Sequence, residues 1–306
     1  MKKLSVLLLA LALTSAPAFA EGAKKLVVLI AGKPSHGHGE HEHNAGVLLF
    51  KKCLEQHSTS LVDVKEHLNA DWPSAEELGK ADTILIYSDG GGGHPALQGD
   101  HLAQLDKEMK RGCGLVCVHY ATEPTKEKGG NEWIDWIGGA FEVNWSVNPH
   151  WTADFSSLPS HPVTSGVKPF STNDEWYFHM HFRDGMKGVT PILTAVPPES
   201  TMGRKDGPHE GNPAVREEVA AKKPQHVAWA AERENGGRGF GFTGGHYHKG
   251  WGNEDQRKLV LNAILWTAKA DVPAGGVESA ITAEDLEQNL DPKAPRPAPA
   301  AKPAAK

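Results

Sequence analysis

The feature that most constrains the fold is a set of short apolar runs in which polar residues do not alternate. Three of these runs are clear, at residues 25–31, 83–87 and 114–119. A strand that is apolar on both faces needs cover on both faces, which is typical of a parallel sheet between helices. Residues 44–56, between the first two runs, carry apolar side chains at helical spacing. The sequence therefore predicts an α/β protein, with a parallel sheet and helices on both of its faces.

The first twenty residues have the pattern of an export signal. Lys2 and Lys3 precede an apolar run over residues 4–13, and Ala-Phe-Ala at residues 18–20 forms a small-x-small cleavage site. The run is too short to span a bilayer comfortably, and no other stretch approaches the roughly 20 apolar residues required. We therefore expect a signal peptide over residues 1–20, a periplasmic or secreted protein, and no integral membrane segment after cleavage. An uncleaved anchor is the alternative.

The C-terminal end changes in composition. Residues 292–306 contain only Pro, Ala, Lys and one Arg, which provide too little apolar surface for independent folding. Residues 281–290 are expected to form a short helix that docks on the body. The predicted organisation is one α/β domain over residues 21–271, followed by a Pro/Ala-rich, largely disordered tail over residues 272–306. The irregular segment of about residues 140–225 is interpreted as insertions that build a pocket rim, not as a separate domain.

The charge balance argues against one class of partner. The chain has 38 acidic and 32 basic residues, and its formal net charge is −6. Loss of the two leader lysines makes the mature chain more acidic still. General nucleic-acid binding needs a basic face, so no nucleic-acid partner is expected.

The three cysteines do not indicate a disulfide framework. Cys113 and Cys117 bracket an expected strand, and four residues of strand separate their Cα atoms by about 13 Å. Cys53 has no further partner, and the sequence has no C-x-x-C-H haem motif. All three are interpreted as buried apolar residues, with a catalytic thiol as the weaker alternative.

Histidines follow four of the expected strands. Residues 35–43, after the first strand, contain four of them, and a glycine run after the third strand ends at His94. His119 ends the next strand, and His246 follows the last. Parallel strands end at one edge of the sheet, where α/β proteins bind their ligands. Histidine is a common metal ligand and general base, so this edge is the expected site.

This histidine-rich edge suits one divalent metal, with Zn²⁺, Mn²⁺ or Fe²⁺ as the candidates. Nearby carboxylates that fit such a centre are Glu40, Glu42 and Glu123. The spacing does not match H-E-x-x-H, so a loose surface metal trap or a plain polar loop stays open. The glycine run lacks the G-K-[ST] of a P-loop, which argues against a nucleotide. The candidate metal ligands are His36, His41, His43 and His248.

A second group of residues suits a sugar-derived small molecule. Aromatic faces beside amides and carboxylates fit the C–H faces and hydroxyls of a sugar, although they also fit ordinary packing. The candidate substrate-binding residues are Trp145, Asn148, His150, Asp174, Glu175, His181 and Tyr247.

Several separate motifs resemble the ThuA-like, trehalose-utilisation family over about residues 25–270. The motifs are Lys-Pro-Ser-His-Gly at residues 33–37, residues 114–122, Asp174-Glu175, and Gly-Gly-His at residues 244–246. The resemblance implies a class I glutamine-amidotransferase-like fold, of flavodoxin-like type. It also implies a role in the catabolism of disaccharides or oxidised 3-keto sugars.

Comparison with true amidotransferases then implies a lost nucleophile. His119 stands where those enzymes have their cysteine, Cys117 lies two residues earlier, and His246 matches their late histidine. The chain is therefore not expected to be a glutamine amidotransferase.

Two classes of function follow. One is an exported enzyme that acts on a glycoside or 3-keto-sugar, with His119 and His246 as acid/base groups or ligands and Glu123 or Glu175 as partner carboxylate. The other is a non-catalytic sugar-binding or scaffold protein that kept the pocket.

Overall fold

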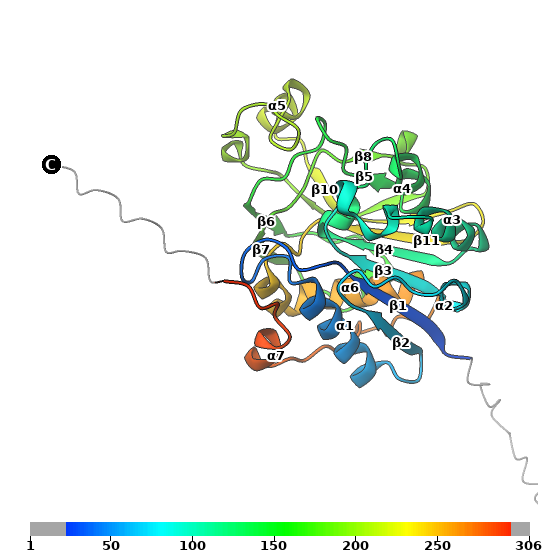
Figure 1. The fold of residues 1–306 in the computed structure, drawn as a ribbon. Helices are drawn as coiled ribbons and strands as arrows, with labels where there is room; N and C mark the ends of the chain where they lie inside the picture. The colour runs from blue at the N-terminus through cyan, green and yellow to red at the C-terminus, as the bar shows by residue number, and fades with distance from the viewer. Residues whose placement is uncertain (1–22, 295–306) are drawn as a thin grey trace, which may run out of the picture.

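The computed structural model describes residues 23–294, in which a seven-stranded sheet forms the centre of the domain (Figure 1). Its strands, in spatial order, are β2 (Val62–His67), β1 (Lys25–Ala31), β3 (Thr83–Tyr87), β4 (Gly114–Val118), β11 (Arg238–Phe242), β10 (Gln225–Glu232) and β9 (Val189–Ala195). The first five pair in parallel, which confirms the expected neighbours β1, β3 and β4.

The α/β class is confirmed, but the sheet is mixed and not wholly parallel. β10 runs antiparallel to both β11 and β9. Only residues 233–237 join β10 to β11, and a connection of that length makes a hairpin, because a parallel pair needs a crossover of a dozen residues or more.

Helices cover both faces of the sheet, as expected. The helices are α1 (His43–His57), α2 (Ala75–Lys80), α3 (His101–Arg111), α4 (Gly130–Trp136), α5 (Pro213–Ala220), α6 (Glu254–Thr267) and α7 (Ala283–Glu287). α1 and α6 pack on one face, whereas α2, α3 and α4 pack on the other. α3 ends at Gly112, whose φ of +90° closes the helix in the left-handed conformation that glycine adopts without strain.

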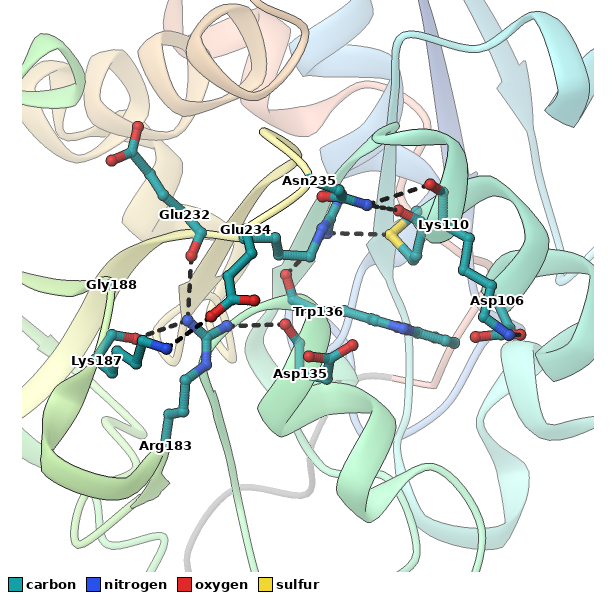
Figure 2. Close-up of a pocket in the computed structure, with 12 residues that line it drawn as sticks. Asp106, Lys110, Asp135, Trp136, Arg183, Lys187, Gly188, Glu232, Glu234 and Asn235 are labelled. Atoms are coloured by element: carbon teal, nitrogen blue, oxygen red, sulfur yellow. Dashed lines mark hydrogen bonds and ion pairs between the residues drawn. The ribbon is translucent and has the colours of Figure 1, made fainter.

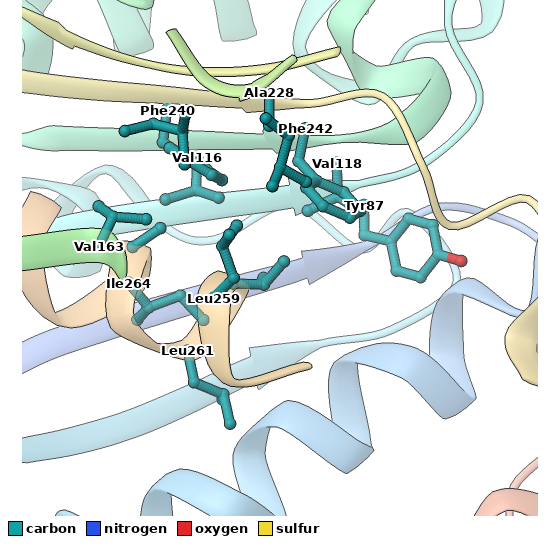
Figure 3. Packing of buried hydrophobic residues seen from close by; sticks show 14 of the residues in the cluster. Tyr87, Val116, Val118, Val163, Ala228, Phe240, Phe242, Leu259, Leu261 and Ile264 are labelled. Atoms are coloured by element: carbon teal, nitrogen blue, oxygen red, sulfur yellow. The ribbon is translucent and has the colours of Figure 1, made fainter. Parts of the chain in front are cut away.

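Successive side chains of each strand point to opposite faces of the sheet, so every central strand contributes to the core on both faces. Val116 and Val118 of β4 point to the α1 and α6 side, and Leu115 and Cys117 point to the other. Figure 3 shows Leu259 of α6 packing beneath this part of the sheet. Both layers are fully buried, which explains why the strand sequences are continuously apolar.

The irregular middle of the chain belongs to the same domain. It forms two small antiparallel sheets, β5 (Gly139–Ala140) with β8 (His181–Phe182), and β6 (Trp151–Phe155) with β7 (Phe170–Asp174). Phe155 and Trp176 lie within the core that α1 and α6 cover. Short 3₁₀ turns complete the structure, at η1 (Gly91–Gly93), η2 (Pro95–Leu97), η3 (His119–Thr122), η4 (Pro162–Thr164), η5 (Asp184–Met186), η6 (Glu199–Met202) and η7 (His248–Gly252).

The first part of the expected tail contacts the domain. Residues 272–294 include α7, and Ile281 and Leu286 pack against the core. Lys293 donates a hydrogen bond to the carbonyl oxygen of Glu40, although it lies in the segment whose composition predicts no docking. The signal-peptide prediction and the end of the tail, residues 295–306, lie outside the described residues. Within residues 23–294, no helix has both the length and the apolarity needed to cross a membrane.

Candidate functional site

Three imidazoles and one carboxylate meet at the carboxyl edge of the sheet. The Nε2 atom of His41 lies 3.1 Å from Nε2 of His119 and 3.0 Å from Nδ1 of His246. A carboxylate oxygen of Glu175 lies 3.1 Å from that same Nδ1 and 3.5 Å from Nε2 of His119. The four ligand atoms lie within 4.8 Å of one another, and all four residues are buried.

The sheet topology explains why His119 and His246 meet. β4 and β11 are parallel neighbours with Val118 paired to Phe242, so the residues that follow both strands emerge at the same edge. His119 has a φ of +57° at the turn from β4 into η3. A non-glycine residue in this region is strained, and such residues cluster at functional sites.

His41 and Glu175 come from loops that are held by backbone contacts. The N–H of His41 donates to the carbonyl of His246 at 2.9 Å, which joins the loop before α1 to the loop after β11. His41 is also in the left-handed region, with a φ of +46°. Glu175 directly follows β7, and the preceding Asp174 accepts hydrogen bonds from the backbone N–H groups of Gly245 and His246. Asp174 therefore fixes the loop that carries His246.

The ring nitrogens that face away from the centre have oxygen partners. Nδ1 of His119 donates to the carbonyl of Thr243 at 2.7 Å, and Nδ1 of His41 lies 2.6 Å from a carboxylate oxygen of Asp89. Nε2 of His246 lies 3.6 Å from a carboxylate oxygen of Glu40. The hydrogen bonds of His119 and His41 are of the kind that orients metal-binding histidines and selects their tautomer.

These outward bonds determine what the inward nitrogens can do. A neutral His119 with its proton on Nδ1 presents a lone pair at Nε2, and the same holds for His41 beside Asp89. Two lone pairs 3.1 Å apart repel each other, and a cation bound between the rings removes the repulsion. The donor set of three imidazoles and a carboxylate therefore fits a divalent metal.

The electrostatics of the cluster agree with this arrangement. Burial and the neighbouring histidines hold the pKa of His41 far below its ordinary value, so its ring is neutral. Burial disfavours the charged form of Glu175, but hydrogen bonds with His119 and His246 outweigh it and lower its pKa. For His246, burial acts to lower the pKa of the imidazole, but the interactions with Glu175 are stronger. The pKa of His246 is therefore raised. The cluster therefore contains an ionised carboxylate at Glu175.

Two of the predicted substrate-binding residues form the rim of the cluster. Nε2 of His150 lies 3.7 Å from a carboxylate oxygen of Glu175, and its Nδ1 lies 3.2 Å from the Tyr247 hydroxyl. Burial lowers the pKa of His150, although about half of the side chain is exposed. His150 is thus a neutral base between solvent and the buried centre.

Glu123 lies outside the four-ligand group and pairs with His209. Nε2 of His209 lies 2.9 Å from a carboxylate oxygen of Glu123. Burial raises the pKa of Glu123, and the hydrogen bond with Glu123 raises the pKa of His209. The sequence had no signal for His209, because no strand or motif precedes it.

The other three substrate-binding predictions have partners elsewhere. Trp145 is 40% exposed and stacks on His179 with ring centroids 4.3 Å apart. Asn148 accepts a hydrogen bond from Arg204 at 2.8 Å. The exposed His181 lies 2.6 Å from a Glu142 oxygen.

The candidate metal ligands divide into two groups. His41 enters the four-ligand group, and the exposed His36 stacks on it with centroids 3.6 Å apart and lies with it beside Asp89. His43 and His248 are buried outside both ligand groups, and burial lowers the pKa of each to about 4.

Asp89 and Tyr177 are two further site residues that the sequence analysis did not single out. Asp89 lies two residues beyond β3, a position that marks it as an edge residue. Tyr177 is buried, and its hydroxyl lies 3.1 Å from Nε2 of His119. It comes from the irregular segment, where no pattern distinguishes it from packing aromatics.

A family comparison agrees with this geometry. The sequence model of the family described as "ThuA: Trehalose utilisation" matches residues 27–267. The chain belongs to the ThuA family. The ThuA fold is also seen in a solved ThuA-like protein from Bacteroides uniformis, with a TM-score of 0.57 and 18% identity over 83% of this chain and 95% of that one. A second, from Parabacteroides merdae, has a TM-score of 0.50 and 14% identity over 85% and 94%. No curated protein matches the chain.

None of the three cysteines in this ThuA domain offers a reactive thiol at the end of β4. Cys117 is buried inside β4, and burial raises the pKa of its thiol far above the ordinary value. Cys53 and Cys113 are also free and buried, as expected. The side chain that emerges at the end of β4 is the imidazole of His119.

A pocket of about 430 Å³ lies at the opposite, amino end of β4 (Figure 2). Its Arg183 donates to the carbonyl oxygens of Asp135, Lys187 and Glu232, as the dashed lines show. Arg233 likewise donates to the carbonyl of Trp136. Because these guanidinium groups bind the backbone, we assign them a structural role and place the site at the histidine cluster.

Proposed function

We propose that this ThuA protein is an exported, metal-dependent enzyme of carbohydrate catabolism that acts on a glycoside or a 3-keto-sugar. The family description supports the carbohydrate class. The observation that carries the metal is the convergence of His41, His119, His246 and Glu175, with the outer nitrogens of the three rings facing oxygen atoms. Export rests on the sequence pattern of residues 1–20.

His41, His119, His246 and Glu175 would hold the metal, and Zn²⁺, Mn²⁺ and Fe²⁺ suit this set of nitrogen and oxygen donors. When bound, such an ion polarises a carbonyl or hydroxyl oxygen and lowers the pKa of water.

The residues around the centre supply proton transfer. The C–H group beside a 3-keto group is acidic, so a base that removes its proton can start elimination of the glycosidic oxygen. His150 is neutral, partly exposed and beside Glu175, which suits that role. The Tyr177 hydroxyl keeps its proton, because burial raises its pKa well above the ordinary value, and it can donate a hydrogen bond to a substrate oxygen at the centre.

The test begins with elemental analysis of the purified full chain. A screen of glycosides and their 3-keto derivatives follows, with and without added Zn²⁺, Mn²⁺ or Fe²⁺. We expect about one metal per chain and turnover that depends on it, both lost in His119→Ala. The matched control is His67→Ala, whose ring pairs with Asp71 and Glu77 away from the site.

Three results would each contradict part of the proposal. Turnover that persists in the metal-free protein would rule out a metal-dependent enzyme. Sugar binding without turnover of any compound would favour the alternative, a binding or scaffold protein. Cell fractionation that leaves the protein in the cytoplasm would refute export.

A further inference from the structure

The loop that carries His41 needs an external support. His41 is a metal-ligand candidate with a φ of +46°, a strained conformation that persists only where the surroundings enforce it. Its backbone N–H donates a hydrogen bond to the carbonyl of His246, which fixes the amide side of the residue. The contacts on its other side come from the C-terminal end of the described chain.

Lys293 binds the backbone of this loop directly. Its ammonium group donates to the carbonyl oxygen of Glu40 at 2.6 Å and lies 3.3 Å from the carbonyl oxygen of His41. It also lies 3.3 Å from a carboxylate oxygen of Glu42, the residue after His41. One cation thus contacts three consecutive residues, and a shift of the loop would break all of these contacts.

Glu42 and Asp291 complete the connection. The other carboxylate oxygen of Glu42 accepts from the N–H of Asp291 at 2.7 Å, and Asn44 donates to the Asp291 side chain at 2.9 Å. Glu42 is fully buried, and only 10% of the Lys293 side chain is exposed. Charges that are removed from water in this way must stay paired, so separating the C-terminal segment from the His41 loop would be costly.

The segment is anchored at its other end as well. Arg257 of α6 donates to the carbonyl of Ser279, and Lys52 of α1 pairs with Asp285 of α7. Figure 1 shows the chain passing from α7 toward the loop between β1 and α1. The family match ends at residue 267, so this segment is an addition to the part of the chain that defines the family.

We infer that residues 279–293 form a strap that positions His41 for metal binding, with Lys293 as the positioning residue. The inference rests on the proposed metal site and names a further determinant of it. Lys293 does not touch the metal ligands' side chains. It acts through the backbone, by holding His41 in the conformation that directs Nε2 toward His119 and His246.

The test compares Lys293→Met with Lys293→Arg and, as a control outside the strap, Lys80→Met in the full chain. Zn²⁺ affinity is measured by competition with a chelating dye, and hydrogen exchange is followed at residues 37–44. We expect Lys293→Met to weaken Zn²⁺ binding by about 10- to 100-fold, the range for residues that orient a ligand. The arginine variant should restore affinity to within a few-fold, because it keeps the charge and the donors. Lys80→Met breaks an exposed ion pair with Glu76 on α2, outside the strap, and should leave affinity unchanged.

Exchange separates failure of the strap from failure of the metal site. Faster exchange at residues 37–44 in Lys293→Met, but not in Lys80→Met, supports the strap even where wild-type protein binds no Zn²⁺. Failure of the wild-type protein to bind Zn²⁺ would refute only the proposed metal function, not the strap. A chain truncated after Leu290 also loses the Asp291 contacts and should show exchange at least as fast as Lys293→Met, whereas one truncated after Ala294 should match the full chain. Unchanged exchange and unchanged Zn²⁺ affinity in Lys293→Met would overturn the inference.

Discussion

Replacing Asp89 tests whether His41 is held as a metal ligand. The carboxylate lies 2.6 Å from Nδ1 of His41, on the opposite side of the ring from the cluster. Asp89→Asn keeps an oxygen that can accept the Nδ1 proton and removes only the charge, so affinity should fall by about 10-fold. Asp89→Ala removes the acceptor and frees the ring to change tautomer, so its loss should approach about 100-fold. These factors correspond to about 1.4 and 2.7 kcal/mol of binding free energy.

The assay is a Zn²⁺ titration against a competing chelator, with circular dichroism melts of the metal-free proteins. Asp71→Ala is the matched control, because Asp71 lies 2.9 Å from Nδ1 of His67 in a similar pair far from the cluster. The predicted order is wild type, Asn variant, Ala variant, with the control equal to wild type. Equal affinities in all four proteins would refute the assignment of His41 as an oriented ligand.

Four further predictions follow from the same structure. A metal present at 100 times its Kd stabilises the folded protein by about 2.7 kcal/mol, so removing it with a chelator should lower the melting temperature by about 5 °C or more. An unchanged melting temperature would contradict a bound metal. Glu175→Gln should weaken metal binding more than Glu123→Gln, because only Glu175 contributes an oxygen to the cluster, and the same titration checks this. Cys117→Ala should retain turnover per folded molecule, because the buried thiol is protonated. A loss of turnover would instead indicate that the Cys117 thiol takes part in catalysis. Burial lowers the pKa of His94 from 6.5 to about 4, so the unfolded chain binds this proton more readily. His94 alone should therefore contribute a fall in stability of about 3 kcal/mol as the pH drops from about 6.5 to 4, and urea melts should show a shallower fall in His94→Gln.

The sequence was most informative where the chain is regular. Continuous apolar runs located β1, β3 and β4, because strands covered on both faces leave that pattern. The parallel arrangement then brought His119 and His246 to one edge, since neighbouring parallel strands end together. β10 gives a similar apolar pattern although it runs antiparallel to both of its neighbours, so only the short hairpin to β11 indicates its direction.

The remaining parts of the site depend on contacts that no local pattern records. His41 could not be separated from the other histidines of its loop, because its position is set by backbone bonds to His246 and Lys293. Glu175 enters from the irregular middle segment as a candidate ligand, where the sequence predicted substrate binding. His94 follows a strand as expected, but its ring binds the local backbone at Ala96 and Ala121.

The order of the candidate ligands along the chain has a consequence for how the proposed centre would select its metal in the cell. They lie at residues 41, 119, 175 and 246, and the strap that supports the first of them ends near residue 293. A polypeptide emerging during synthesis or crossing a membrane unfolded therefore carries only scattered donors, which cannot chelate an ion together. The centre exists only after the last segment has arrived and the domain has closed. A chain exported in that state would take its metal from the compartment in which it folds, so the ions available there, more than the intrinsic preference of the imidazoles, would decide which one it holds.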